Sequence, residues 1–197
     1  MQDEGLRLGM GGHHSARALA TEWYTPPAIF EALGLEFDLD PCAPAGGLPW
    51  IPARRFLSID DDGLSHPWEG RVWLNPPYGR ATAAWMRRLA AHGDGVALVF
   101  ARTDTAWFHE VATSAHVICF IAGRLTFVPA SPDQRNNERS NFNSGAPSML
   151  MAFGEECGEV VARAGLGMVF GVCARPLLGQ ASLWEDERSN APATISA

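Results

Sequence analysis

Short apolar runs recur along the middle of the chain, and segments with helical spacing of apolar residues separate them. Runs of this length that end at Gly, Pro or Asp are typical of buried strands. One run, Glu36 to Asp40, alternates strictly between acidic and apolar residues, as a strand at one face of a core would. The predicted strands span 36–40, 71–74, 95–100, 116–121, 147–153 and 168–173.

Three segments are predicted to be helical. In 82–92 apolar residues recur at i,i+4 spacing, which indicates an amphipathic helix. A helix that ends before Gly34 would have Thr25 as its N-cap and proline in its first turn. The turn 102–104 would end a strand and cap a third helix over 106–112.

Strands that alternate with helices predict an α/β fold with a mostly parallel sheet. The stretch 41–70 is the exception, because it holds five prolines and only 30 residues before the next strand. Parallel crossovers need a dozen or more residues, usually helical, so two ordinary βα units do not fit here. We expect a shortened sheet edge, with a short strand near 55–57 and an acidic loop over 60–64.

The remaining segments differ in composition from this core. Residues 1–20 are Gly-rich and predict a flexible lead-in, in which His13-His14 lack a third nearby ligand, so no metal site is expected. The polar stretch 129–145 predicts a mobile loop near the substrate. With 176–197 as a flexible tail, the sequence predicts one domain over 21–175.

Composition narrows the class of protein. At 197 residues the chain can bury a real core, and it has neither an apolar run of membrane-spanning length nor a signal peptide, so a cytoplasmic location is expected. The four cysteines are scattered without a Cys-x-x-Cys pair, which argues against zinc and against a disulfide framework.

Charge leaves the partner open. The net charge of −7 speaks against nucleic acid, but residues 54–139 carry 10 Arg against 9 acidic residues, while both ends of the chain are acidic. All 15 basic residues are Arg, which suits bidentate contacts to phosphate and base edges. A compositional bias of the genome explains a chain without Lys equally well.

Asn75-Pro76-Pro77-Tyr78 directly follows the predicted strand 71–74. Proline fixes φ, lacks an N–H and forces the preceding residue to be extended, so this motif predicts a rigid bend. In open α/β sheets, ligands sit at such carboxyl ends of strands. The alternative is a buried strand that ends in a Pro-rich turn, and only the neighbouring segments can decide between the two.

The bend presents the groups that a conjugated amine needs. Such an amine is a poor nucleophile because its lone pair is delocalised into the ring. The Asn75 side-chain oxygen and the Pro76 carbonyl could accept its two N–H groups and favour a pyramidal nitrogen, while Tyr78 stacks on the ring. Catalysis would then rest on positioning and dipoles, with no general base of tuned pKa.

Seven segments together resemble the phage-type DNA N6-adenine methyltransferases, which use S-adenosylmethionine. The resemblance covers residues 22–153 and follows the order helix cap, acidic turn, acidic loop, Asn-Pro-Pro-Tyr. It implies a Rossmann-like methyltransferase fold. The segments are Trp23-Tyr24-Thr25-Pro26, Asp40-Pro41-Cys42-Ala43, Asp62-Gly63-Leu64, Trp68, Asn75-Pro76-Pro77-Tyr78, Arg102-Thr103-Asp104 and Gly123-Arg124-Leu125-x-Phe127.

The resemblance also implies residue roles. The catalytic residues would be Asn75, Pro76, Pro77 and Tyr78. Those that hold S-adenosylmethionine would be Tyr24, Thr25, Asp40, Cys42, Ala43, Asp62 (or Asp61) and Asn75. Those that meet the DNA and its flipped adenine would be Tyr78, Arg102, Arg124 and Phe127. A core position for Phe127, structural salt bridges for the arginines and a solvated turn for the aspartates are the alternatives.

The chain departs from the family pattern in an imperfect glycine loop after Asp40 and in the lack of a segment of target-recognition size. Asn-Pro-Pro-Tyr is also similar to the motif of methyltransferases that act on protein glutamine amides or on guanine N2 of RNA. A non-catalytic cofactor-binding or nucleic-acid-binding module is a further alternative. The order of the motifs favours DNA adenine, and a phage or prophage origin would place the enzyme in the cytoplasm of the bacterial host.

Overall fold

The computed structural model describes residues 23–129 and 145–172. The predictions for residues 1–20 with His13-His14, for nearly all of the loop 129–145 and for the tail 176–197 lie outside these residues. The predicted domain boundaries therefore stay a prediction.

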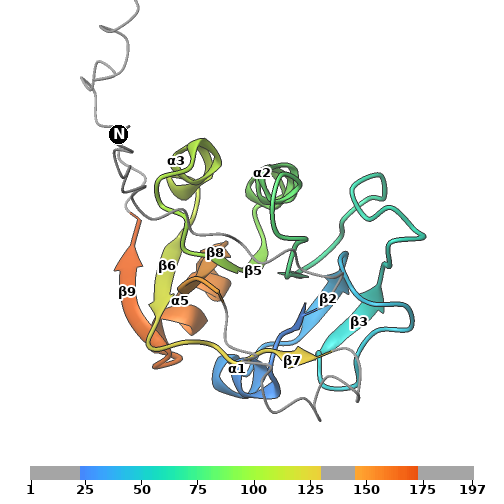
Figure 1. The fold of residues 1–197 in the computed structure, drawn as a ribbon, viewed down its shortest axis with the longest axis horizontal. Coiled ribbons are helices and arrows are strands. Elements are labelled where there is room, and N and C mark those ends of the chain that lie inside the picture. The colour runs from blue at the N-terminus through green and yellow to red at the C-terminus, as the bar shows by residue number, and fades with distance from the viewer. Residues whose placement is uncertain (1–22, 130–144, 173–197) are drawn as a thin grey trace, which may run out of the picture.

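A seven-stranded sheet forms the centre of the molecule, with the strand order β3-β2-β4-β5-β8-β6-β9 (Figure 1). The pairs β2–β3, β2–β4 and β4–β5 are parallel, while β8 lies antiparallel between β5 and β6, and β9 is antiparallel to β6. Five strands thus share one direction, which confirms the predicted mostly parallel α/β sheet. The strands are β2 (Phe37–Asp40), β3 (Ala53–Phe56), β4 (Val72–Leu74), β5 (Gly95–Phe100), β6 (Val117–Ile121), β8 (Ser148–Phe153) and β9 (Gly167–Gly171).

Helices cover both faces of the sheet. Figure 1 shows α2 (Thr82–His92) and α3 (Ala106–Ala112) on one side and α1 (Pro27–Leu33) on the other. The helix α5 (Glu155–Arg163) packs into the same core as α1. Side chains of the central strands alternate between two cores, so that Trp73 packs toward α1 while Val72 and Leu74 pack toward α2. This double burial explains why these strands are continuous apolar runs.

The sheet edge formed by β2 and β3 is shortened, as predicted. Neither the connection from β2 to β3 nor the one from β3 to β4 contains a helix. Trp68 replaces the missing helix as a packing element: its Nε1 donates to the Gly63 carbonyl at 2.8 Å, and its ring stacks on Trp85 at 6.1 Å between centroids. The short strand lies at Ala53–Phe56, two residues before its predicted position.

Two local predictions were wrong, and one helix was missed. The N-cap of α1 is Pro26, not Thr25, whose side chain is buried and makes no capping hydrogen bond. The helix α3 is capped by Thr105 and not by the turn 102–104. The helix α5 was not predicted, because its buried apolar side is narrow and it contains Gly158. That glycine is required by packing, since a Cβ there would lie 2.8 Å from the Cβ of His116.

A separate two-stranded ribbon joins the start of the described residues to the segment that follows β6. In it, β1 (Trp23–Tyr24) pairs antiparallel with β7 (Val128–Pro129), so that Trp23 faces Pro129 and Tyr24 faces Val128. The ribbon brings the segment before α1 beside the segment that follows β6. Among the helices of the described residues, none has the length and apolar character needed to cross a bilayer.

Candidate active site

The Asn75-Pro76-Pro77-Tyr78 bend begins where β4 ends, at the carboxyl edge of the parallel strands. Because β2 and β5 flank β4 and run parallel to it, their last residues, Asp40 and Phe100, lie at the same edge. The bend therefore occupies the middle of the edge at which open α/β sheets bind ligands.

The side-chain amide of Asn75 is held in one orientation. Its Nδ2 donates to the backbone carbonyl of Trp23 at 3.1 Å, and its Oδ1 accepts from the Tyr78 hydroxyl at 3.2 Å. A carbonyl can only accept, so the contact with Trp23 fixes which end of the amide is nitrogen. The oxygen consequently points to the Tyr78 side, where its second lone pair can accept another donor.

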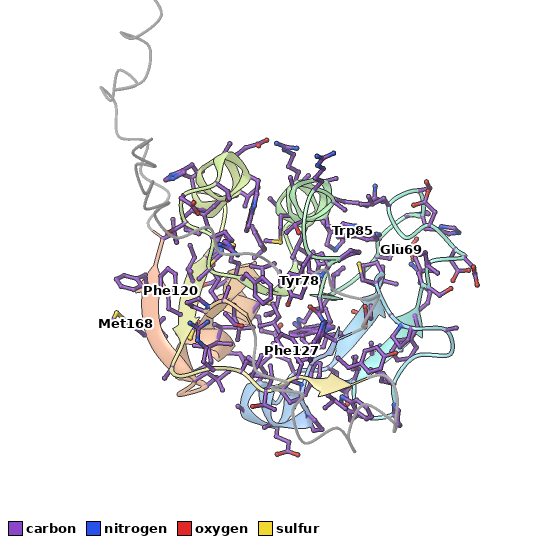
Figure 2. All side chains as sticks on the ribbon, in the orientation of Figure 1. Glu69, Tyr78, Trp85, Phe120, Phe127 and Met168 are labelled. Atoms are coloured by element: carbon purple, nitrogen blue, oxygen red, sulfur yellow. The ribbon has the colours of Figure 1, made fainter. Side chains whose placement is uncertain are left out.

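Tyr78 belongs to a small aromatic cluster. Its ring stacks on Phe100 with centroids 4.0 Å apart and an interplanar angle of 7°, and it meets Phe127 nearly at right angles at 6.4 Å. Figure 2 shows Tyr78 and Phe127 near the middle of the molecule. Burial raises the pKa of the Tyr78 phenol, so this hydroxyl stays a neutral donor to Asn75.

The backbone of the bend is fixed by α2. The Thr82 hydroxyl donates to the Pro77 carbonyl at 2.9 Å, which ties the second proline to the first turn of the helix. Pro76 is buried and Pro77 is exposed. Within the described part of the chain no backbone donor outside the helices and strands meets the Pro76 carbonyl.

Asp40 is a buried carboxylate at the end of β2, with 3% of its surface exposed. Its Oδ1 accepts the backbone N–H of Cys42 at 3.0 Å. Burial outweighs that hydrogen bond and raises the pKa of Asp40 to about 7. The same burial, together with the nearby Asp40 charge, raises the pKa of the Cys42 thiol, which stays protonated. A carboxylate in this state favours a cation or a further donor as its partner.

The predicted acidic loop lies against the turn that follows Asp40. A Cβ at Gly63 would be 2.1 Å from the Pro41 carbonyl oxygen, so only glycine permits this approach. Asp62 is exposed and accepts the Ser65 hydroxyl, and its φ of 51° lies in the left-handed region. Asp61 is exposed and accepts from the N–H and hydroxyl of Ser58, contacts that lower its pKa.

An open hollow of about 410 Å³ lies beside this loop, between the turn that follows β2 and the strand β3. The ring of Phe56 forms part of it, and Gly47 lies close to this ring: a Cβ on Gly47 would be 2.8 Å away. The lining residues are Pro44, Ala45, Gly46, Arg54, Arg55, Phe56, Ser58 and Asp61. Asp61, but not Asp62, lines this hollow.

The other predicted site residues differ in their burial and in their hydrogen-bonding partners. Tyr24 is half-buried in β1, and Ala43 is buried behind Asp40. Thr25 is 1% exposed, and its hydroxyl has no partner among the described residues. Arg102 and Arg124 are exposed, and neither forms an ion pair within the described ranges.

Three contributors to the site were missed in the sequence. Phe100 stacks on Tyr78, and the Trp23 carbonyl orients Asn75. Ser148, the first residue of β8, lies opposite Phe100 and is 2% exposed, with no partner for its hydroxyl within the described residues. The position of Phe100 at the end of a buried strand was the available signal, whereas Ser148 and Trp23 depend on long-range pairing.

The described residues hold no group of three or more His, Cys, Asp or Glu side chains placed to bind a metal ion. Cys42, Cys119 and Cys157 are free thiols. The site is therefore built from amide, hydroxyl, carboxylate and aromatic groups.

Comparison with known families agrees with this arrangement. A family model described as DNA N-6-adenine-methyltransferase (Dam) matches residues 13–162, about three quarters of the chain. No curated protein matches the sequence.

Proposed function

This chain belongs to the DNA N-6-adenine-methyltransferase family, and on that premise we propose that S-adenosylmethionine is its methyl donor and that Asn75-Pro76-Pro77-Tyr78 holds the target amine. Family membership makes the protein an enzyme that methylates adenine N6 in DNA. The observation that supports the site assignment best is the fixed orientation of the Asn75 amide.

The target amine is held by two acceptors in this proposal. Asn75 Oδ1 takes one N–H of the adenine N6 group through its remaining lone pair, and the Pro76 carbonyl takes the other. Both acceptors are fixed before the substrate arrives, one by Trp23 and one by the two-proline backbone, so little reorganisation is needed in the reaction. The nitrogen becomes strongly acidic only as the new N–C bond forms, so its proton would then pass to solvent water, and a general base of tuned pKa is not required.

The adenine ring is recognised by the aromatic cluster. Tyr78 offers the ring on which a flipped base stacks. Phe127 is a core residue, 3% exposed, and its edge-on contact with Tyr78 supports that ring. Phe100 fixes the plane of Tyr78 from within the protein. The proposed DNA contacts of Arg102 and Arg124 fit their exposure at the ends of β5 and β6.

The residues around Asp40 fit S-adenosylmethionine, which supplies an electrophilic methyl group on a sulfonium when bound. The buried Asp40 carboxylate suits a hydroxyl or ammonium donor, and the unpartnered Thr25 hydroxyl suits a polar group of the same ligand. Cys42 and Ala43 form the turn against which the ligand would lie. Either Asp61, which lines the hollow, or Asp62, which lies next to Asp61 in the chain, accepts from the amine of the nucleoside. Tyr24 and Asn75 are the remaining residues proposed to hold S-adenosylmethionine.

The decisive experiment is transfer of a radiolabelled methyl group to unmethylated duplex DNA, with Asn75→Ala as the control. The proposal expects label in N6-methyladenine with the wild-type protein and loss of nearly all label in the variant. Label in a protein or RNA fraction instead would support the glutamine or guanine alternatives, and cofactor binding without transfer would support a non-catalytic module. We further propose a phage or prophage gene as the source, and with that source the enzyme would act in the cytoplasm of the bacterial host.

A further inference from the structure

The described arginines fall into two groups. Six of the nine bind a carboxylate or a backbone carbonyl, among them Arg87 with Glu110 and Arg163 with Glu159. The other three are Arg80, Arg102 and Arg124, which are exposed and have no hydrogen-bonded or ionic partner in the described part of the chain. The partnered six are Arg54, Arg55, Arg71, Arg87, Arg88 and Arg163.

The three unpaired arginines follow three strands that end at the same edge. Arg80 follows β4, Arg102 follows β5, and Arg124 follows β6, and these strands share one direction. The paired arginines lie elsewhere, on β3, in the body of α2, before β4 and at the end of α5. The free positive charge of the described domain is therefore gathered at one rim.

Each arginine of this rim is close in sequence to a residue of the aromatic cluster. Arg80 lies two residues after Tyr78, Arg102 two residues after Phe100, and Arg124 three residues before Phe127. The ring of Tyr78 contacts those of Phe100 and Phe127 at 4.0 and 6.4 Å. Because one residue spans at most about 3.6 Å, each arginine backbone lies within roughly 7–11 Å along the chain of a clustered residue.

We propose that Arg80, Arg102 and Arg124 form a rim that binds the phosphates on either side of the flipped adenine. The inference rests on the proposed function. It identifies a positively charged surface by which a protein of net charge −7 could bind negatively charged DNA. Guanidinium groups bind phosphate oxygens bidentately, and three of them around one base pocket position a strand without reading its sequence. One exposed carboxylate, Asp104, lies in the same turn as Arg102. With three arginines against this one carboxylate, the rim keeps a net positive charge.

The test is the salt dependence of duplex binding, measured by fluorescence anisotropy in the presence of S-adenosylhomocysteine. Each phosphate contact contributes about 0.9 to the slope of log K against log salt, so raising salt from about 50 to 200 mM weakens binding roughly 3.5-fold per contact. The three single Gln variants should each lose about 0.9 of slope, whatever the sequence of the duplex.

The rim double variant is Arg102→Gln/Arg124→Gln. The control double variant is Arg87→Gln/Arg163→Gln, which removes the same charge from exposed ion pairs. The rim double variant should lose about 1.8 of slope, whereas the control double variant should keep the wild-type slope. Equal slopes in the two double variants would overturn the rim. If wild-type protein methylates DNA and the slopes are equal, only the rim is wrong. If wild-type protein transfers no label to DNA, the proposed function itself fails.

Discussion

Replacing Asn75 by alanine tests the central claim about the site, because this side chain makes two contacts with separable effects. The Nδ2 contact with the Trp23 carbonyl joins β1 to the bend, and the Oδ1 side meets Tyr78 and, in the proposal, the amine. The first contact belongs to the folded protein at all times, whereas the second acts on the reaction.

The expected magnitudes differ for the two contacts. Loss of one preorganised hydrogen-bonding group at the reacting centre costs about 10²–10³-fold in kcat. Loss of the amide leaves the Trp23 carbonyl and the Tyr78 hydroxyl without this partner, at roughly 1 kcal/mol each for half-buried groups. For a domain of this size, that total lowers Tm by about 4–8 °C. Because Asn75 is one of seven residues proposed to hold the cofactor, cofactor affinity should change by no more than about 3-fold, a difference below 0.7 kcal/mol.

Three measurements separate these effects: single-turnover methyl transfer, calorimetric titration of S-adenosylhomocysteine, and thermal unfolding. Asn75→Asp is the matched variant, because it retains an acceptor of the same size but places oxygen against the Trp23 carbonyl. We expect it to lose less of kcat than Asn75→Ala while losing at least as much in Tm. A collapse of cofactor affinity in both variants, or an unchanged kcat in Asn75→Ala, would refute the assignment.

Three further predictions concern neighbouring groups. Tyr78→Phe keeps the stack and should change the KM for DNA little, while Tyr78→Ala should weaken base capture by about 1–3 kcal/mol; equal KM values would contradict the stacking role. Burial raises the pKa of Asp40 to about 7, so the folded protein binds this proton more tightly than the unfolded chain does. The free energy of unfolding of the ligand-free protein should therefore fall as pH rises from 3.8 to about 7 and then level off. Asp40→Asn should flatten this profile in denaturant titrations, and an unchanged profile would exclude Asp40 as its source. Gly63→Ala must displace the acidic loop from Pro41 and should lower the cofactor affinity measured by titration. Gly171→Ala is the control, because its new Cβ meets no atom within 4 Å. Equal cofactor affinities in the two variants would show that the loop does not form the site.

The strands of the main sheet, the helix α2 and the bend itself were predictable because they depend on local chemistry. Two prolines after a buried strand leave the backbone little choice, and the i,i+4 apolar positions of 82–92 define α2 with the observed bounds. The prolines of 41–70 likewise predicted the shortened edge, since they leave no room for a helix. The family match then confirmed what the order of the motifs implied.

The parts that were not predicted depend on contacts between distant segments. Thr25 has the residue type of an N-cap, but two prolines after it start the helix one residue later, and its side chain turns into the interior. The direction of β8 and β9 follows from the sheet and leaves no pattern in a buried apolar run. No local signal connects Trp23 to Asn75 across 52 residues or Phe100 to Tyr78 across 22.

The ribbon of β1 and β7 shows why those distant contacts matter for the chemistry. Trp23 contributes its carbonyl to Asn75 and its ring to Phe127, at 6.2 Å between centroids, and its strand pairs with the one that follows Phe127. A single strand therefore orients the Asn75 amide and supports Phe127, the two groups to which the proposal gives the amine and the base. A displacement of β1 would release both groups together, so the proposed acceptor and the proposed base-binding ring depend on the same strand pairing. We therefore expect amine binding at the two-proline bend to require an intact ribbon.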